Sequence, residues 1–377
     1  MKPDARIMSK ELSVYYSPLV LHHPTGAGVF EAPPSPLFEV DEPHPENAQR
    51  IANMRSVLRK GPIAGLIDWI EAPSATLDQM LRFHDAAYLE SLTGIPEGET
   101  RRVTSSTVFG PGSWPAVEAA AGQAIAAVDH VWREKGGLAY ALVRPPGHHA
   151  QPSMADGYCF VNNIGVALEE ARTHGLRRAA VIDWDVHHGN GTQQGYYRDP
   201  DVLTISIHMD HRSWGANHPQ NGTPEEAGEA DAVGTNLNIA LPLGSGDASY
   251  RCAFDRLVAP VVEQFAPELI VIACGQDANQ FDPNGRSCVT MGGFHDLGKR
   301  ARALADRCCE GRLALVQEGG YALSYAALCL HATLAGALGE PIGIEDPLAF
   351  LPDPTEEVED RIEQLAQRWR TAASRKG

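Results

Sequence analysis

The stretch AAVIDWDVHHGNGT, residues 179–192, places a strand-like run of small and apolar residues directly before two aspartates, two histidines and a glycine-rich turn. Its first half is almost continuously apolar, as in a parallel β-strand that is covered on both faces. In α/β proteins the carboxyl ends of parallel strands share one edge of the sheet, and ligands bind there. The stretch therefore predicts a buried strand with a functional site at its end.

Similar apolar runs recur along the chain, with helical patterns between them. Apolar residues recur at helical spacing in 115–132, the segment 249–265 is amphipathic with a kink expected at Pro260, and 293–308 fits a third helix. Strands that alternate with helices predict an α/β fold with a mostly parallel sheet. The five predicted strands are residues 138–143, 179–185, 202–208, 269–275 and 313–319.

Polar, chemically reactive residues follow four of these strands. The segments are PPGHHA after 138–143, DWDVHHGNG at the end of 179–185, CGQDANQFDP at the end of 269–275 and QEGGY at the end of 313–319. Because parallel strands bring their carboxyl ends to one edge, we expect the four clusters to converge in one crevice. Each cluster alone fits a turn, a cap or a surface accident, but their shared placement indicates a metal-dependent hydrolase.

A divalent metal site is predicted within these clusters. Asp185 and His187 are two residues apart, so their side chains point the same way if the chain stays extended. Asp277, beyond a different strand, is the natural third ligand. Two oxygens and one nitrogen suit zinc, with a fourth position open to water, although iron or cobalt would also fit. Asp183 lies further back, where it would support the site or bind a monovalent cation.

Three further side chains supply the remaining chemistry. A metal-activated water needs a base to take its proton and an acid to protonate the leaving group, and the adjacent His148 and His149 could divide those roles. A carboxylate such as Asp183 would tune their basicity. Tyr321 follows two glycines, which allow a tight turn that brings its hydroxyl over the metal. There it would donate to an oxyanion, and the loss of one such donor typically lowers the rate about 10²–10³-fold.

The composition is that of an ordinary soluble globular protein, with 377 residues, 43% of them hydrophobic and 21% charged. The net charge of −17 argues against a nucleic-acid partner and is compatible with cationic substrates, or simply with solubility. The seven cysteines form no CxxC pair, so we expect neither a disulfide framework nor a thiolate metal site. With no signal peptide and no apolar stretch of membrane-spanning length visible, we expect a cytoplasmic protein without membrane contact.

We expect residues 1–345 to form one catalytic domain, with long surface loops at 24–47 and 209–235. Residues 346–377 are expected to be a C-terminal extension with an amphipathic helix, for which Asp353 is the predicted N-cap. This helix would pack on the domain or on a neighbouring subunit. The N-terminal loop and the extra helix together suggest a homo-oligomer.

The motifs RPPGHHA, DGYCFVNN, VIDWDVHHGNGT, LTISIH, GQDANQFDP and EGGY resemble those of the zinc-dependent histone deacetylase superfamily, which has the arginase/deacetylase fold. The resemblance runs from about residue 44 to about residue 340 and extends to bacterial histone-deacetylase-like amidohydrolases. It implies a single domain with an eight-stranded parallel sheet flanked by helices. It also implies an amidohydrolase that removes acyl groups from amines, with small-molecule or peptide substrates of the acyl-lysine type.

The resemblance assigns roles to individual residues. Asp185, His187 and Asp277 become zinc ligands, His148 and His149 the general acid and base, and Tyr321 the group that polarises the substrate carbonyl. Gly157 and Tyr158 would line the substrate channel, whereas Trp214 and His218 do not match the family's usual second wall, a Phe. The family's structural potassium ion would be bound by Asp183, Asp185, His187, Ser206 and the backbone of Ile207.

One departure from the family pattern is HHGNG in place of the frequent HHGDG, which is similar to the class II-like branch. Asn190 stands where an aspartate would support the second histidine, so His149 should be less basic than usual.

Three rival functions stay open at this point. In an acetylpolyamine amidohydrolase, Glu97 and Glu99 could contact a cationic substrate, although a solvated loop explains them equally well. A manganese ureohydrolase would need DxHxD patterns, and the chain has DxDxHH. A non-catalytic binder should have lost a ligand, a base or the tyrosine, and none is lost.

Overall fold

The computed structural model describes residues 11–26, 35–133, 137–211, 222–346, 348 and 355–374. Eight strands form one sheet in the order β2-β1-β5-β10-β9-β6-β7-β8, and every neighbouring pair is parallel. The expected eight-stranded parallel sheet is therefore confirmed. The strands are β1 (Leu12–Tyr15), β2 (Ile67–Ile70), β5 (Leu138–Ala141), β6 (Ala179–Asp183), β7 (Val202–Met209), β8 (Asn236–Leu241), β9 (Leu269–Cys274) and β10 (Leu313–Gln317).

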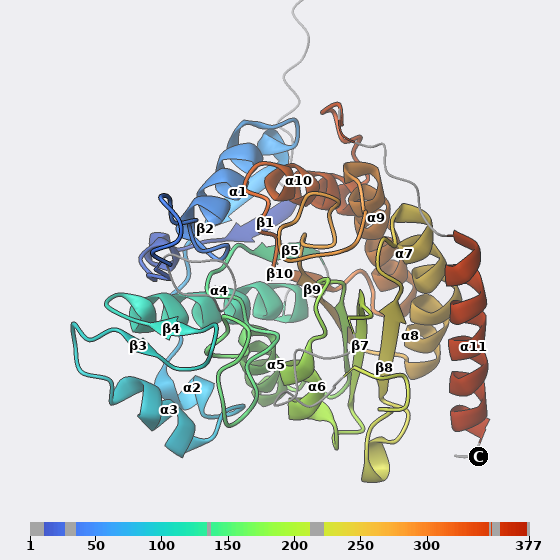
Figure 1. Cartoon of the computed structure of the whole chain (residues 1–377). Helices are drawn as coiled ribbons and strands as arrows, with labels where there is room; N and C mark the ends of the chain where they lie inside the picture. The colour runs from blue at the N-terminus through green and yellow to red at the C-terminus, as the bar shows by residue number, and fades with distance from the viewer. Residues whose placement is uncertain are drawn as a thin grey trace, which may run out of the picture.

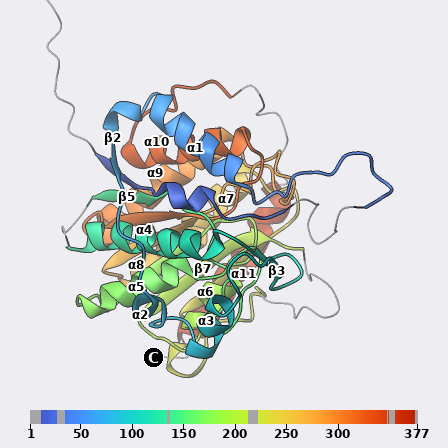
Figure 2. The same cartoon turned by 90° about the vertical axis from the view of Figure 1, so that its left-hand side faces the viewer.

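Helices cover both faces of this sheet, as Figures 1 and 2 show from two directions. One face packs against α1 (Ala48–Lys60), α9 (Met291–Cys308) and α10 (Tyr325–Leu338), and the other against α4 (Ser113–Arg133) and α5 (Asn163–Thr173). Strand residues alternate between the two cores: Ala180 and Ile182 belong to the first, Ala179 and Val181 to the second. Burial on both faces is why these strands are continuously apolar in sequence.

The three predicted helices form with small changes at their ends. The segment 249–265 becomes α7 (Asp247–Ala253), a π-helical turn (Phe254–Val258) and α8 (Ala259–Phe265). Pro260 lies in the first turn of α8. A proline inside a helix lacks the N–H donor and clashes with the preceding turn, and the wider turn comes directly before it.

The C-terminal helix α11 (Thr355–Ser374) packs on the same domain, against α7, the π-helical turn and the edge strand β8. Its residues Val358, Ile362, Leu365 and Ala366 are buried and join the first core. Arg361 forms an ion pair of 2.6 Å with Asp210, just beyond β7. The predicted N-cap Asp353 lies outside the described residues.

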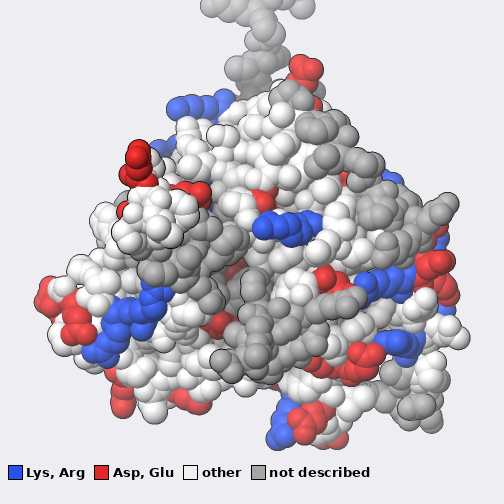
Figure 3. Space-filling view, in the orientation of Figure 1, with Lys and Arg blue, Asp and Glu red and all other residues white. Residues whose placement is uncertain are grey.

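Shorter elements connect these layers, among them α2 (Leu77–Met80), α3 (Ala86–Thr93), α6 (Asn190–Tyr196) and the two-stranded ribbon of β3 (Arg101–Arg102) and β4 (Val108–Phe109). All seven cysteines are free thiols. Within the described ranges, no helix combines the length and apolarity that a membrane crossing requires. On the face shown in Figure 3, Lys and Arg side chains are interspersed with Asp and Glu.

Candidate metal centre and active site

Three predicted ligands meet at the carboxyl edge of the sheet. His187 Nδ1 lies 3.0 Å from Asp185 Oδ1 and 3.0 Å from Asp277 Oδ2. One ligand atom from each residue lies within 4.8 Å of the others, and all three side chains are buried. β6 ends at Asp183, and the chain bends over 185–187 instead of continuing as the extended strand that we expected. The bend turns Asp185 and His187 toward Asp277, which follows β9, the strand paired with β6.

This donor set fits a divalent metal ion. Burial raises the pKa of Asp277, and the charge of the neighbouring Asp185 raises it further. Two carboxylates in a pocket of this kind resist carrying two negative charges unless a cation lies between them. Two oxygens and one imidazole nitrogen are a usual protein ligand set for zinc that leaves a position open.

Two glycines make room for the ligand carboxylates. A Cβ atom at Gly275 would lie 2.3 Å from Asp185 Oδ2, and one at Gly319 would lie 2.0 Å from Asp277 Oδ2. Backbone amides orient the same groups: the Gly319 N–H donates to Asp185 Oδ2 at 2.7 Å, and the Val186 N–H donates to Asp277 Oδ1 at 2.9 Å. We did not predict either glycine contact, although Gly275 directly follows β9 and Gly319 lies two residues beyond the end of β10.

The two histidines after β5 lie against this cluster, with ring centroids 4.0 Å apart. His148 Nδ1 contacts the carboxylate of Asp183 at 2.9 Å, and its Nε2 is 3.8 Å from Asp185 Oδ1. His149 Nδ1 contacts the amide oxygen of Asn190 at 2.6 Å, and its ring centroid is 6.0 Å from that of His187. Both expected supporting partners, Asp183 and Asn190, are therefore in contact with their histidines.

The surroundings shift the pKa values of the two histidines in opposite directions. Burial lowers the pKa of His149, and the neighbouring His148 and His187 lower it further. Burial also acts to lower the pKa of His148, but the charges of Asp185 and Asp183 outweigh it and raise that pKa well above the usual value. His148 has a charged partner, the carboxylate of Asp183, whereas His149 has a neutral one, the amide of Asn190. The two histidines therefore differ in basicity.

Tyr321 lies at the same edge, on the turn after β10. Its backbone N–H donates to Asp282 Oδ2 at 2.7 Å, and the Arg50 guanidinium lies over its ring, 4.8 Å from the centroid. Arg50 also donates from Nε to the carbonyl of Gly320 at 2.8 Å, which holds the turn. Burial raises the pKa of Tyr321, so the hydroxyl remains protonated and able to donate. Sequence reasoning missed Arg50 and Asp282; Asp282 lies within the quoted motif GQDANQFDP, but nothing in the sequence indicated that either residue contacts this turn.

The predicted channel residues flank this centre. The Tyr158 ring packs edge-on against Tyr321 at 5.8 Å and against His44 at 4.9 Å, and its hydroxyl accepts from Asn284 Nδ2 at 3.3 Å. Gly157 has φ of +48°, and a Cβ there would lie 2.2 Å from His149 Cδ2, so only glycine fits against that ring. Trp214 and His218 lie outside the described residues.

Of the residues expected around potassium, Asp183 ends β6, Ser206 and Ile207 lie on β7, and Asp185 and His187 follow β6. Asp183 pairs in register with Ser206. The Asp185 N–H donates to Asp183 Oδ1 at 3.0 Å, and Ser206 Oγ lies 3.0 Å from His208 Nδ1. Ile207 is fully buried beside them. By contrast, Glu97 and Glu99 are exposed, and Glu99 pairs with Arg101 at 2.9 Å.

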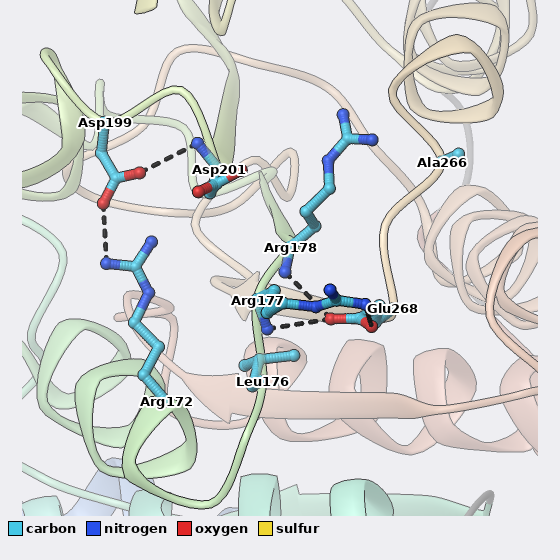
Figure 4. A pocket seen from close by; sticks show the side chains of 8 residues that line it. All are labelled: Arg172, Leu176, Arg177, Arg178, Asp199, Asp201, Ala266 and Glu268. Carbon is cyan, nitrogen blue, oxygen red and sulfur yellow. Dashed lines mark hydrogen bonds and ion pairs between the residues drawn. The ribbon is translucent and has the colours of Figure 1, made fainter.

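A separate surface pocket lies at the opposite, amino ends of the strands (Figure 4). Its polar groups neutralise one another: Arg172 pairs with Asp199 at 2.7 Å, and Glu268 Oε2 accepts from the Arg177 and Arg178 backbone at 2.8 and 3.1 Å. None of the predicted site residues lines it. The predicted metal-ligand and histidine residues lie instead at the carboxyl edge of the sheet.

A parallel α/β sheet with buried carboxylates, imidazoles and a phenol at this edge is the arrangement expected of a metal-dependent hydrolase. A family model described as the histone deacetylase domain matches residues 44–337. The chain is 45% identical to histone deacetylase 8 of Arabidopsis thaliana over 92% of this chain and 93% of that protein. It is 36% identical to a histone deacetylase-like amidohydrolase of Pseudomonas aeruginosa, over 96% and 97% of the two chains.

Solved structures agree with these relatives. The crystal structure of the HDA15 HD domain superposes with a TM-score of 0.80 at 29% identity, covering 98% of this chain and 97% of that one. The chain belongs to the histone deacetylase family, and it is a deacetylase of the amidohydrolase type.

Proposed function

We propose that this deacetylase is a zinc-dependent amidohydrolase that removes acetyl and related acyl groups from primary amines, with acyl-lysine-type substrates preferred. The observation that carries the proposal is the meeting of Asp185, His187 and Asp277, within 4.8 Å of one another, beside two histidines. Family membership favours this activity over the manganese ureohydrolase and the non-catalytic binder.

Each protein group then has a defined task. Asp185, His187 and Asp277 would hold the zinc ion, which when bound supplies Lewis acidity toward the amide carbonyl and the attacking water. His149 has its Nδ1 directed at Asn190, so its Nε2 is free to accept the proton of the water and later to deliver it to the departing amine. His148, paired with Asp183, remains protonated and stabilises negative charge.

The phenol of Tyr321 would donate a hydrogen bond to the oxyanion that develops on the substrate carbonyl. Arg50 and Asp282 hold its ring and its backbone, so the hydroxyl is positioned before the substrate binds. Tyr158 and Gly157 would form one wall of the channel for the acyl-amine chain, beside Tyr321 and His149.

A substrate panel tests this function. Zinc-loaded protein is assayed with acetyl-lysine peptides, acetylputrescine and acetylspermidine, with Asp277→Asn as the ligand-deficient control. We expect the highest kcat/KM with the peptides and almost no turnover by the control. A clear preference for acetylspermidine would identify a polyamine amidohydrolase instead, and failure on both substrate classes would reject the proposal.

We also propose a structural potassium ion near Asp183 and Ser206, supported by the carboxylate and hydroxyl that face each other across β6 and β7. A higher Tm in potassium than in equimolar tetramethylammonium would support it, and equal Tm values would reject it.

A cytoplasmic homo-oligomer is our proposal for the assembly. Three large apolar side chains on the loop before α1 are exposed, Leu37 by 88%, Phe38 by 71% and Val40 by 79%, and oligomers often bury such groups. Light scattering after size-exclusion chromatography measures the assembly state.

A further inference from the structure

An asparagine beside a catalytic histidine presents a problem of orientation. Its side chain carries an acceptor oxygen and a donor NH₂ group on the same carbon, and rotation by half a turn exchanges them. If the oxygen faces the imidazole, that ring nitrogen carries the proton; if the NH₂ group faces it, the ring takes the other tautomer. In a serine protease, replacing the supporting aspartate by asparagine lowers kcat about 10⁴-fold for this reason.

In this protein a second carboxylate decides the orientation of Asn190. Asn190 Nδ2 donates to Asp156 Oδ2 at 2.9 Å, while Asn190 Oδ1 lies 2.6 Å from His149 Nδ1. An ionised carboxylate only accepts hydrogen bonds, so the NH₂ group of Asn190 must face Asp156. The oxygen of Asn190 must then face His149, and the imidazole proton resides on Nδ1.

Asp156 is itself held rigidly. Its Oδ1 accepts from the Gly157 N–H at 2.9 Å, and its carbonyl accepts from the Cys159 N–H at 2.7 Å. Gly157 packs against the His149 ring at the same time. Asn190 is buried at the start of α6, whereas Asp156 is half-buried, so the two sides of this contact come from separate segments of the chain.

We infer that Asp156 is a positioning residue that acts through the amide of Asn190 to hold His149 in the tautomer with a free Nε2. The Nδ1–H of His148 is instead held directly, by the carboxylate of Asp183 at 2.9 Å. Asp183 thus contacts His148 directly, whereas Asp156 acts on His149 through the side-chain amide of Asn190. The inference rests on the proposed function in assigning His149 a catalytic task.

The test compares kcat for an acetyl-lysine peptide among four zinc-loaded proteins: the unchanged chain, Asp156→Ser, Asn190→Asp and the double variant. A serine at 156 can still accept from the Gly157 N–H but is too short to reach Asn190. We expect Asp156→Ser to lower kcat roughly 10–100-fold, the usual effect of removing a group that orients an active-site imidazole, with KM nearly unchanged.

The double variant separates positioning from a structural role. Asn190→Asp alone sets two carboxylates against each other and should also lower kcat. With serine at 156, an aspartate at 190 accepts from His149 Nδ1 with either oxygen, so kcat should recover toward that of the unchanged chain. Asp156→Ser lowering kcat by the same factor in both backgrounds would overturn the inference.

A spectroscopic readout decides the question without turnover. Nitrogen-15 NMR of histidine-labelled protein reports which ring nitrogen is protonated, with the His149 signal assigned by its loss in His149→Gln. We expect the proton on Nδ1 in the unchanged chain and a mixture of tautomers in Asp156→Ser. A single Nδ1–H tautomer in both proteins would overturn the inference. If no acylated amine is turned over, the proposed function fails while this spectrum still determines the role of Asp156.

Two further variants complete the design. Asp199→Ala removes a half-buried aspartate at the opposite ends of the strands (Figure 4), and we expect it to change neither kcat nor the His149 signal. Asp156→Asn offers one acceptor oxygen to two donors, the Gly157 N–H and Asn190 Nδ2. If that oxygen keeps the Gly157 N–H, the new NH₂ group faces Asn190 and turns the Asn190 oxygen away from His149, so we expect kcat to fall and the single Nδ1–H tautomer to be lost. An unchanged kcat together with a single Nδ1–H tautomer in Asp156→Asn would overturn the inference.

Discussion

Gly319→Ala tests whether the metal centre depends on the close approach of the backbone to two ligand carboxylates. The added Cβ would lie 2.0 Å from Asp277 Oδ2 and 2.5 Å from Asp185 Oδ2, whereas ordinary van der Waals contact begins at 3.4 Å. In a close-packed interior one or both carboxylates must therefore move by roughly 1 Å. Neither can move freely, because Gly319 N–H and Val186 N–H already hold them at 2.7 and 2.9 Å.

The magnitudes follow from that displacement. We expect zinc affinity to fall about 10–100-fold, as when a group that orients metal ligands is lost. With zinc in excess, kcat should still fall on the order of 10²-fold, because a misplacement of about 1 Å has that effect on a reaction that requires alignment. Overpacking should also lower the free energy of unfolding by about 1–3 kcal/mol.

The assay measures zinc per chain by mass spectrometry after dialysis, kcat across a zinc titration, and Tm with and without zinc. Gly65→Ala is the matched control, because a Cβ at Gly65 meets no atom within 4 Å. One tightly held zinc ion and an unchanged kcat in Gly319→Ala would refute the steric argument and with it the assigned position of the metal.

Three further predictions concern other parts of the molecule. Tyr321→Phe keeps the ring under Arg50 but removes the hydroxyl, so kcat should fall about 10²–10³-fold with zinc content unchanged; full activity would contradict its role as an oxyanion donor. Burial lowers the pKa of His84 to about 4, so between the unfolded value of 6.5 and about 4 the unfolded chain binds a proton that the folded chain does not. Stability should therefore fall as the pH decreases through that window, by about 2 kcal/mol at pH 5, and His84→Gln should flatten the dependence seen in urea titrations. Ile362→Ala removes buried apolar surface from α11 and should lower the free energy of unfolding by about 2–4 kcal/mol. Its control, Glu359→Ala at an exposed position of the same helix, should have little effect. A loss below about 0.5 kcal/mol in Ile362→Ala would mean that α11 unfolds separately.

The sequence by itself determined the class of fold and the set of reactive residues. Buried parallel strands such as β6 and β9 are recognisable because both their faces are covered, which makes them continuously apolar. The reactive groups are recognisable because parallel strands end at one edge, so Asp185, His187 and Asp277 could be assigned to a common site before any contact was seen. The strands β1, β2 and β8 escaped prediction because they are short or carry alternating asparagines, as in Asn236 and Asn238.

Only the tertiary structure decided how these groups are oriented. Arg50 reaches the Gly320 carbonyl across 270 residues, and Asp156 reaches Asn190 across 34, and no local pattern encodes either contact. The bend after Asp183, which turns the ligands toward Asp277, replaces the extended chain that spacing alone implied. The local sequence indicates which face of a helix or strand is buried, because most buried positions require an apolar residue. Side-chain direction depends on packing between segments that are remote in the chain, and it exists only once the whole core has formed.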